Sequence, residues 1–121
     1  MVLVDTSLWV AHLRQGHSGL ESLLNAAAVV CHPFIIGELA CGNLKQRWQI
    51  LSLLRSLPGA VEAKNEEVMD LIERHGLMGK GLGFIDMHLL ASAMLTNIPL
   101  WTLDRSLNQA ASMVGIAFRA R

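Results

Sequence analysis

Four acidic residues stand beside apolar runs of this chain, where an unpaired carboxylate is costly. They end or interrupt the stretches MVLVD, PFIIGELAC, GLGFIDMHLLASA and PLWTLD, and they are Asp5, Glu38, Asp86 and Asp104. Most of the other carboxylates crowd one polar segment, residues 62–73. A carboxylate in apolar surroundings must be paired, hydrogen-bonded or bound to a cation. Four of them at the ends of predicted core elements indicate a metal site.

Oxygen ligands of this kind suit a hard divalent cation. Mg²⁺ is commonly held by a few carboxylates, keeps several of its waters and also binds substrate phosphate. Without a cation, four neighbouring carboxylates would repel one another and raise one another's pKa. The chemistry that this set of residues favours is therefore metal-assisted chemistry on phosphate.

Each of the four also has an ordinary structural explanation. Asp5 and Asp104 each precede a predicted helix, where a carboxylate can cap the first turn. Asp86 falls in the first turn of an apolar helix, where it interacts favourably with the helix dipole. Glu38 would be an exposed helical position, although the residues one turn away are apolar or neutral: Phe34, Ile35, Cys41 and Gly42.

The elements that must position these residues alternate between strands and helices. We expect strands at 1–4, 28–32 and 99–103, with weaker ones at 60–62 and 116–118. We expect helices from Thr6, and at 20–27, 33–41, 44–57, 65–75, 84–96 and 105–114. Such alternation predicts an α/β protein with a parallel sheet and helices on both faces. Ligands of these sheets collect at the carboxyl ends of the strands, where Asp5 and Asp104 fall.

Length and composition set further bounds. At 121 residues the chain is expected to form one domain, residues 1–121. Its net charge is zero, so binding of nucleic acid would need a local basic patch. Candidate residues for such a patch are Arg14, Lys45, Arg47, Lys80 and Arg105. The hydrophobic fraction of 52% predicts an apolar surface for a partner or a second copy.

The two cysteines and the N-terminus bear on the compartment. Cys31 and Cys41 lack zinc-site spacing, and we expect two buried, reduced thiols. MVLVDTSLWV lacks the basic start of a signal peptide, and no apolar stretch of membrane-spanning length is free of charge. The expectation is a soluble, cytoplasmic protein without a membrane partner.

The stretches VDTSLW, IIGELACG, GLGFIDMHLLASA and LWTLDRSL occur in this order along nearly the whole chain. With them the chain resembles a PIN-domain ribonuclease, specifically a VapC-type toxin of a bacterial toxin–antitoxin pair. The resemblance implies a PIN-like three-layer sandwich with a short parallel sheet. It also implies that Asp5, Glu38, Asp86 and Asp104 form the catalytic acidic site.

The resemblance assigns roles within that site. Asp5 and Asp86 would bind Mg²⁺ or Mn²⁺ directly, while Glu38 and Asp104 would hold metal-bound water or a second ion. Asp104 is thus a third expected metal residue. The ion would activate water for attack on an RNA phosphodiester.

Four other residues are expected near the RNA substrate: Thr6, Lys80, Thr102 and Arg105. Thr6 or Ser7, together with Thr102, match the hydroxyl neighbours of the family's acidic site, and Arg105 matches a basic position. Thr6 and Ser7 are equally good helix caps, and Thr102 an equally good core residue. The glycine-rich segment 76–83 around Lys80 could be a flexible connector.

Partners follow from the same resemblance. The family forms homodimers and binds an antitoxin peptide in a groove of its early helices, here between Leu8 and Leu54. Two other classes are weighed against it. A phosphoacceptor signalling domain would need paired acids after the first strand and a Lys after the last, and this chain has neither. An inactive binding module on this fold is disfavoured by four intact acids.

Overall fold

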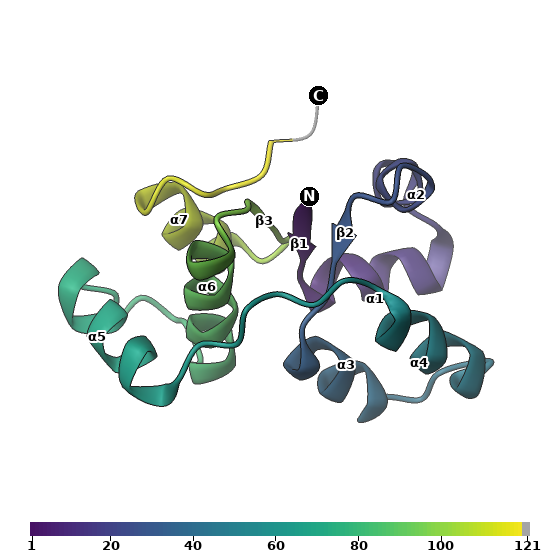
Figure 1. Cartoon of the computed structure of the whole chain (residues 1–121), viewed down its shortest axis with the longest axis horizontal. Coiled ribbons are helices and arrows are strands. Elements are labelled where there is room, and N and C mark those ends of the chain that lie inside the picture. Colours follow the sequence, from purple (N-terminus) through teal and green to yellow (C-terminus); the bar gives the residue numbers. More distant parts are fainter. Residues whose placement is uncertain (120–121) are drawn as a thin grey trace.

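The computed structural model describes residues 1–119, in which seven helices surround a three-stranded parallel sheet (Figure 1). The strands are β1 (Val2–Val4), β2 (Val29–Val30) and β3 (Leu100–Trp101). The helices are α1 (Thr6–Gln15), α2 (Ser18–Asn25), α3 (Pro33–Ala40), α4 (Arg47–Ser56), α5 (Asn65–His75), α6 (Phe84–Thr96) and α7 (Arg105–Met113). The predicted α/β class and parallel sheet are confirmed.

The first strand lies in the centre of the sheet, in the order β2-β1-β3. Leu3 is paired with Val30 on one side and with Leu100 on the other. All residues of the three strands are buried, which accounts for their continuous apolar runs in the sequence. In Figure 1, α5, α6 and α7 lie to one side of the strands, and α1 to α4 lie to the other.

The expected outer strands at 60–62 and 116–118 are reduced to single parallel bridges, Cys31 with Gly59 and Leu100 with Ala117. The first segment pairs with side chains instead of with a strand. Val61 N donates to Thr96 Oγ1 at 2.9 Å, and Ala63 N donates to Ser92 Oγ at 3.3 Å. Hydroxyl groups of α6 therefore satisfy backbone groups that a longer strand would have paired.

The helices α5 and α6 have the bounds expected from sequence, whereas α4 begins at Arg47 rather than at 44. Residue Gln46 has a left-handed backbone (φ 50°), which interrupts the helix. The Arg47 guanidinium donates to the carbonyls of Ala40 and Gly42 at 2.7 and 3.2 Å. The chain between α3 and α4 is thus tied to the end of α3.

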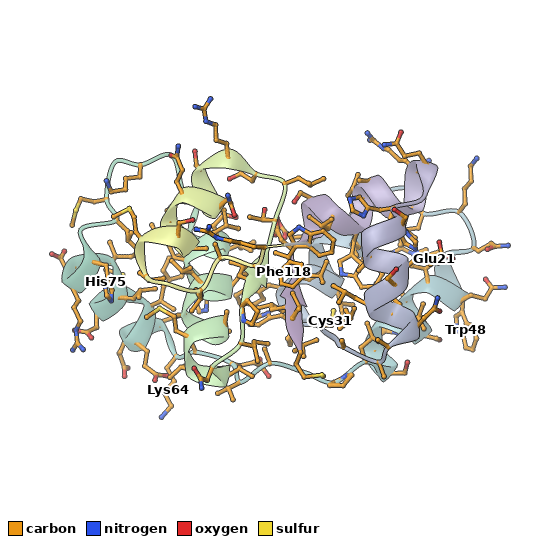
Figure 2. The ribbon with its side chains drawn as sticks, turned by 90° about the horizontal axis from the view of Figure 1, so that it is seen from above. Glu21, Cys31, Trp48, Lys64, His75 and Phe118 are labelled. Carbon is orange, nitrogen blue, oxygen red and sulfur yellow. The ribbon has the colours of Figure 1, made fainter. Side chains whose placement is uncertain are left out.

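Residues of the same type differ in how deeply they are buried. Trp9 and Trp101 are buried, whereas Trp48 on α4 is 79% exposed and extends from the periphery in Figure 2. Cys31 lies in the interior, where burial raises the pKa of its thiol. Cys41 is exposed, so the expectation of two buried thiols is wrong for it, because it follows α3 at the surface. Within residues 1–119 no helix is long and apolar enough to cross a membrane.

Candidate active site

Asp5 occupies the centre of the candidate site. It follows the central strand β1, is only 6% exposed, and caps α1. Its Oδ2 accepts hydrogen bonds from Ser7 N at 3.4 Å, Ser7 Oγ at 2.8 Å and Thr102 Oγ1 at 2.7 Å. All three donors reach the same oxygen, so the other oxygen, Oδ1, is the one left to bind a ligand.

Two hydroxyl groups join the end of β1 to the end of β3. Thr102 Oγ1, which donates to Asp5, accepts from Asp104 N at 3.0 Å. Ser7 Oγ accepts from Leu103 N at 2.9 Å and lies 3.2 Å from Thr102 Oγ1. Thr102 is therefore a hydrogen-bonding residue of this edge of the sheet as well as a buried one.

Asp86 and Asp104 are held at the beginnings of two helices. Asp86 Oδ2 accepts from Gly83 N at 3.0 Å before α6, and Asp104 Oδ2 accepts from Leu107 N at 2.8 Å in α7. Asp104 and Asp5 thus have the capping role expected of each, and Asp86, expected only to interact with the helix dipole, also accepts a backbone hydrogen bond at the helix start. The positive ends of three helix dipoles stabilise three carboxylates here. Capping and membership of one acidic cluster are compatible.

The electrostatics of Asp86 show that three of the carboxylates are neighbours. Its pKa is raised above the ordinary value, first by burial and then by the negative charges of Asp5 and Asp104. The hydrogen bond from Gly83 N opposes this rise. Like charges raise a carboxyl pKa only at short range, so Asp86 lies close to both.

Glu38 reaches the same edge from α3. It is exposed, and its Oε1 accepts a hydrogen bond from Thr6 Oγ1 at 2.7 Å. Since Thr6 follows Asp5 directly, this bond places the Glu38 carboxylate at the start of α1, the helix that Asp5 caps. A cavity of about 750 Å³ opens here between α1, α3 and the start of α4, with Thr6, Glu38, Arg14 and Lys45 among its lining residues.

The expected cations lie on adjoining segments. Lys80 is exposed between Gly79 and Gly81, whose backbones are left-handed (φ 69° and 78°). A Cβ on Gly81 would lie 3.4 Å from Ser106 Oγ, so this loop runs against the start of α7. Arg105, also exposed, is the first residue of that helix. The loop is thus packed at this point, beside the helix that carries Arg105.

The donor set fits a hard divalent cation by its chemistry. Its ligands would be carboxylate oxygens alone, and the pKa of one of them, Asp86, is raised in part by the charges of Asp5 and Asp104. Among residues 1–119, no three His, Cys, Asp or Glu side chains already meet around one point as a finished metal site. One oxygen of each acid is engaged by a donor of the chain itself, and binding would use the second oxygens.

Sequence reasoning left Thr6 and Ser7 as equivalent, and the structure separates them. The Ser7 hydroxyl hydrogen-bonds to Asp5 and to the backbone after β3, whereas the Thr6 hydroxyl donates to Glu38. The signal for Ser7 was its position two residues after a capping Asp, where its backbone and hydroxyl both face the carboxylate. A second contact that the sequence did not reveal joins His88 Nε2 to Asn65 Oδ1 at 3.0 Å.

Sequence comparison places this arrangement among known proteins. The PIN domain family profile matches residues 2–113. Ribonuclease VapC32, from two strains of Mycobacterium tuberculosis, is 42% identical over 118 residues, which span 97% of this chain and 95% of that protein.

Two solved structures share the fold at 19% identity. FitAcB from Neisseria gonorrhoeae has a TM-score of 0.66, with 93% of this chain and 94% of that chain covered. PAE2754 from Pyrobaculum aerophilum has a TM-score of 0.67, with 97% and 87% covered. At this identity the likeness concerns the fold alone.

Proposed function

The chain belongs to the PIN-domain family, and we propose that it is a metal-dependent endoribonuclease, the toxin of a toxin–antitoxin pair. The observation that supports the proposal is that Asp5 and Asp104 follow neighbouring strands, with Asp86 close enough to respond to the charges of both. The identity to a ribonuclease over almost the whole chain supports the choice of RNA as substrate.

Asp5 and Asp86 are the proposed ligands of Mg²⁺ or Mn²⁺. A bound ion would lower the pKa of a coordinated water and offset charge that develops on the phosphate. The Asp5 carboxylate is fixed by Ser7 and Thr102, so its free oxygen keeps one direction toward the ligand. A cation bound by Asp86 would offset the burial and the neighbouring negative charges that raise the pKa of this carboxyl group.

Glu38 and Asp104 are the proposed holders of the attacking water and its proton. Both are exposed, and each retains an oxygen that no donor of the chain engages among the described residues. Thr6 and Thr102 direct their hydroxyl hydrogens to Glu38 and Asp5, so we assign them to positioning of these carboxylates. The exposed cations Lys80 and Arg105 are proposed to bind the RNA backbone.

The antitoxin is proposed to occupy the cavity beside Glu38. Its walls are apolar at Val10, Leu13 and Leu39, and Arg14 and Lys45 lie at its edge. A peptide there would block access to Glu38. A homodimer is proposed as well, since Trp48 and other apolar side chains are exposed on the single chain.

Cleavage of a labelled RNA in Mg²⁺ or Mn²⁺ tests this function. Asp5→Ala and Asp86→Ala should abolish cleavage, as should a chelator. Asp70→Asn is the matched control, since this exposed carboxylate on α5 is paired with Arg74 away from the site. Cleavage that persists in both alanine variants would exclude the acidic mechanism, and a native protein that cuts no RNA would favour an inactive binding module.

A further inference from the structure

Two partly exposed phenyl rings pack against one buried imidazole. Phe34 is 38% exposed and Phe84 is 47% exposed, whereas His88 between them is 4% exposed. The ring centroids of Phe34 and Phe84 lie 5.0 and 4.7 Å from that of His88, with interplanar angles of 69° and 89°. The two phenyl rings are therefore no further apart than these two distances combined.

Buried neighbouring side chains hold this aromatic pair, Phe34 and Phe84, in place. His88 is anchored by the hydrogen bond between its Nε2 and Asn65 Oδ1. Phe34 also packs against the buried His32 ring, with centroids 5.0 Å apart. Because the rings are already ordered, a ligand that stacks on them loses less entropy than one that must order them.

The aromatic pair adjoins the acidic site from two helices. Phe34 and Glu38 are four residues apart on α3 and so share a face of that helix. Phe84 and Asp86 both lie in the first turn of α6, so they share the end of that helix although residues two apart point to different sides of it. Asp86 accepts from Gly83 N, which brings its carboxylate back toward the start of the helix that carries Phe84.

A neutral nuclease needs another source of affinity for RNA. The net charge is zero, so attraction to the phosphate backbone rests on a few local cations such as Lys80 and Arg105. Stacking of bases on aromatic side chains needs no charge and is open only to unpaired bases, whose faces are free. Exposed, ordered rings beside the acids have the required chemistry.

We infer that Phe34 and Phe84 stack unpaired bases next to the phosphate to be cleaved. This inference rests on the proposed ribonuclease function. A second copy of the chain is the other candidate to cover the rings. It would also cover the start of α6, where Asp86 lies, and so would block access of a substrate to the acids.

Steady-state cleavage of one RNA sequence, single-stranded and in a duplex, tests the inference. The double change Phe34→Leu with Phe84→Leu retains apolar volume but removes the aromatic faces. It should raise KM for the single strand by about tenfold per ring and leave kcat nearly unchanged. The double change to Tyr keeps both faces and should keep KM near the native value. The native protein should prefer the single strand.

Leu95→Ala is the matched control. Leu95 lies near the other end of α6 and is 46% exposed, so its loss removes a similar apolar side chain away from the acids. An unchanged KM in the double variant Phe34→Leu with Phe84→Leu would overturn the stacking role, and so would equal cleavage of duplex and single strand. In both cases the proposed ribonuclease function would still stand. If sedimentation instead shows that this double variant has a different oligomeric state, the two rings contact a second copy of the chain. Absence of any cleavage by the native protein would overturn both proposals.

Discussion

The acidic site has a buried centre and an exposed rim, and the two are held differently. At the centre, Asp5 and Thr102 are each 6% exposed, and Asp5 Oδ2 accepts three hydrogen bonds. At the rim, Glu38 and Asp104 are exposed, and each accepts a single hydrogen bond. The centre is thus arranged before any ligand binds, whereas the rim is free to adjust to one.

This difference implies a division of labour. A preorganised carboxylate stabilises a bound cation without reorganisation, and a mobile one can follow a water and its proton. Changes at the centre should therefore affect both folding and cleavage, whereas changes at the rim should affect cleavage alone.

The largest effect is expected from Asp5→Asn. The amide removes the charge of the only carboxylate within residues 1–119 that is fixed by three hydrogen bonds, so RNA cleavage should fall on the order of a thousandfold. Asn still caps a helix, so the secondary structure by circular dichroism should persist. Substantial cleavage by this variant would break the assignment of Asp5 to the centre.

A smaller loss is expected from Glu38→Gln at the rim. The amide oxygen can still accept from Thr6, so the melting temperature should stay at the native value while cleavage falls about a hundredfold. Both quantities can be measured on the same preparation. A loss as large as that of Asp5→Asn, or a clear fall in melting temperature, would remove the distinction between centre and rim.

The hydroxyl groups offer a matched pair of tests by unfolding in urea. Thr102→Val deprives Asp5 Oδ2 of a donor and Asp104 N of an acceptor in buried surroundings, and should lower the free energy of unfolding by about 1–2 kcal/mol. Thr6→Val removes one exposed hydrogen bond and should cost under about 0.5 kcal/mol. Equal losses of unfolding free energy in the two variants would contradict the distinction between a buried centre and an exposed rim.

A small effect on stability is expected at Asp86, and it depends on pH. Its folded pKa lies above the ordinary value of 3.8, so the native state binds more protons than the unfolded state between these values. The stability contributed by this group is therefore greatest below pH 3.8 and is lost as the pH rises through the folded pKa.

Asp86→Asn removes that titration and should stabilise the protein at neutral pH by less than about 1 kcal/mol, while it abolishes cleavage. Thermal melting at several pH values provides the measurement. Added Mg²⁺ should raise the melting temperature of the native protein and leave that of the variant unchanged. A variant that is less stable than the native protein at neutral pH would contradict the electrostatic account.

Local sequence signals were sufficient for much of the fold. The bounds of α5 and α6 follow from a clear amphipathic pattern in one and a sustained apolar run in the other, each ended by a residue with left-handed backbone, Gly76 and Asn97. The cap of α5 lies one residue before the helix begins. Lys64 takes that place, with Glu67 Oε1 accepting from its backbone nitrogen, and Asn65 binds His88 instead.

The remaining features depend on contacts between distant segments. The start of α4 is set by Arg47 and the end of α3, and the segment after Gly59 pairs with hydroxyl groups of α6 rather than with a strand. In the acidic site, residue type and apolar context selected the four acids as candidates, and their membership of one site stays a prediction. The partner of each hydroxyl was not predictable, because Thr6 and Glu38 lie 32 positions apart and Thr102 and Asp5 lie 97 apart.

The separation of 97 positions between Asp5 and Thr102 has a consequence for the nascent chain. The central strand β1 is the first to leave the ribosome, yet one of its two neighbours, β3, is among the last. At synthesis rates of about 5–20 residues per second, Asp5 waits several seconds for Thr102. The proposed nuclease centre therefore cannot assemble on a partly made chain, and a translating cell meets the activity only after the last strand has emerged.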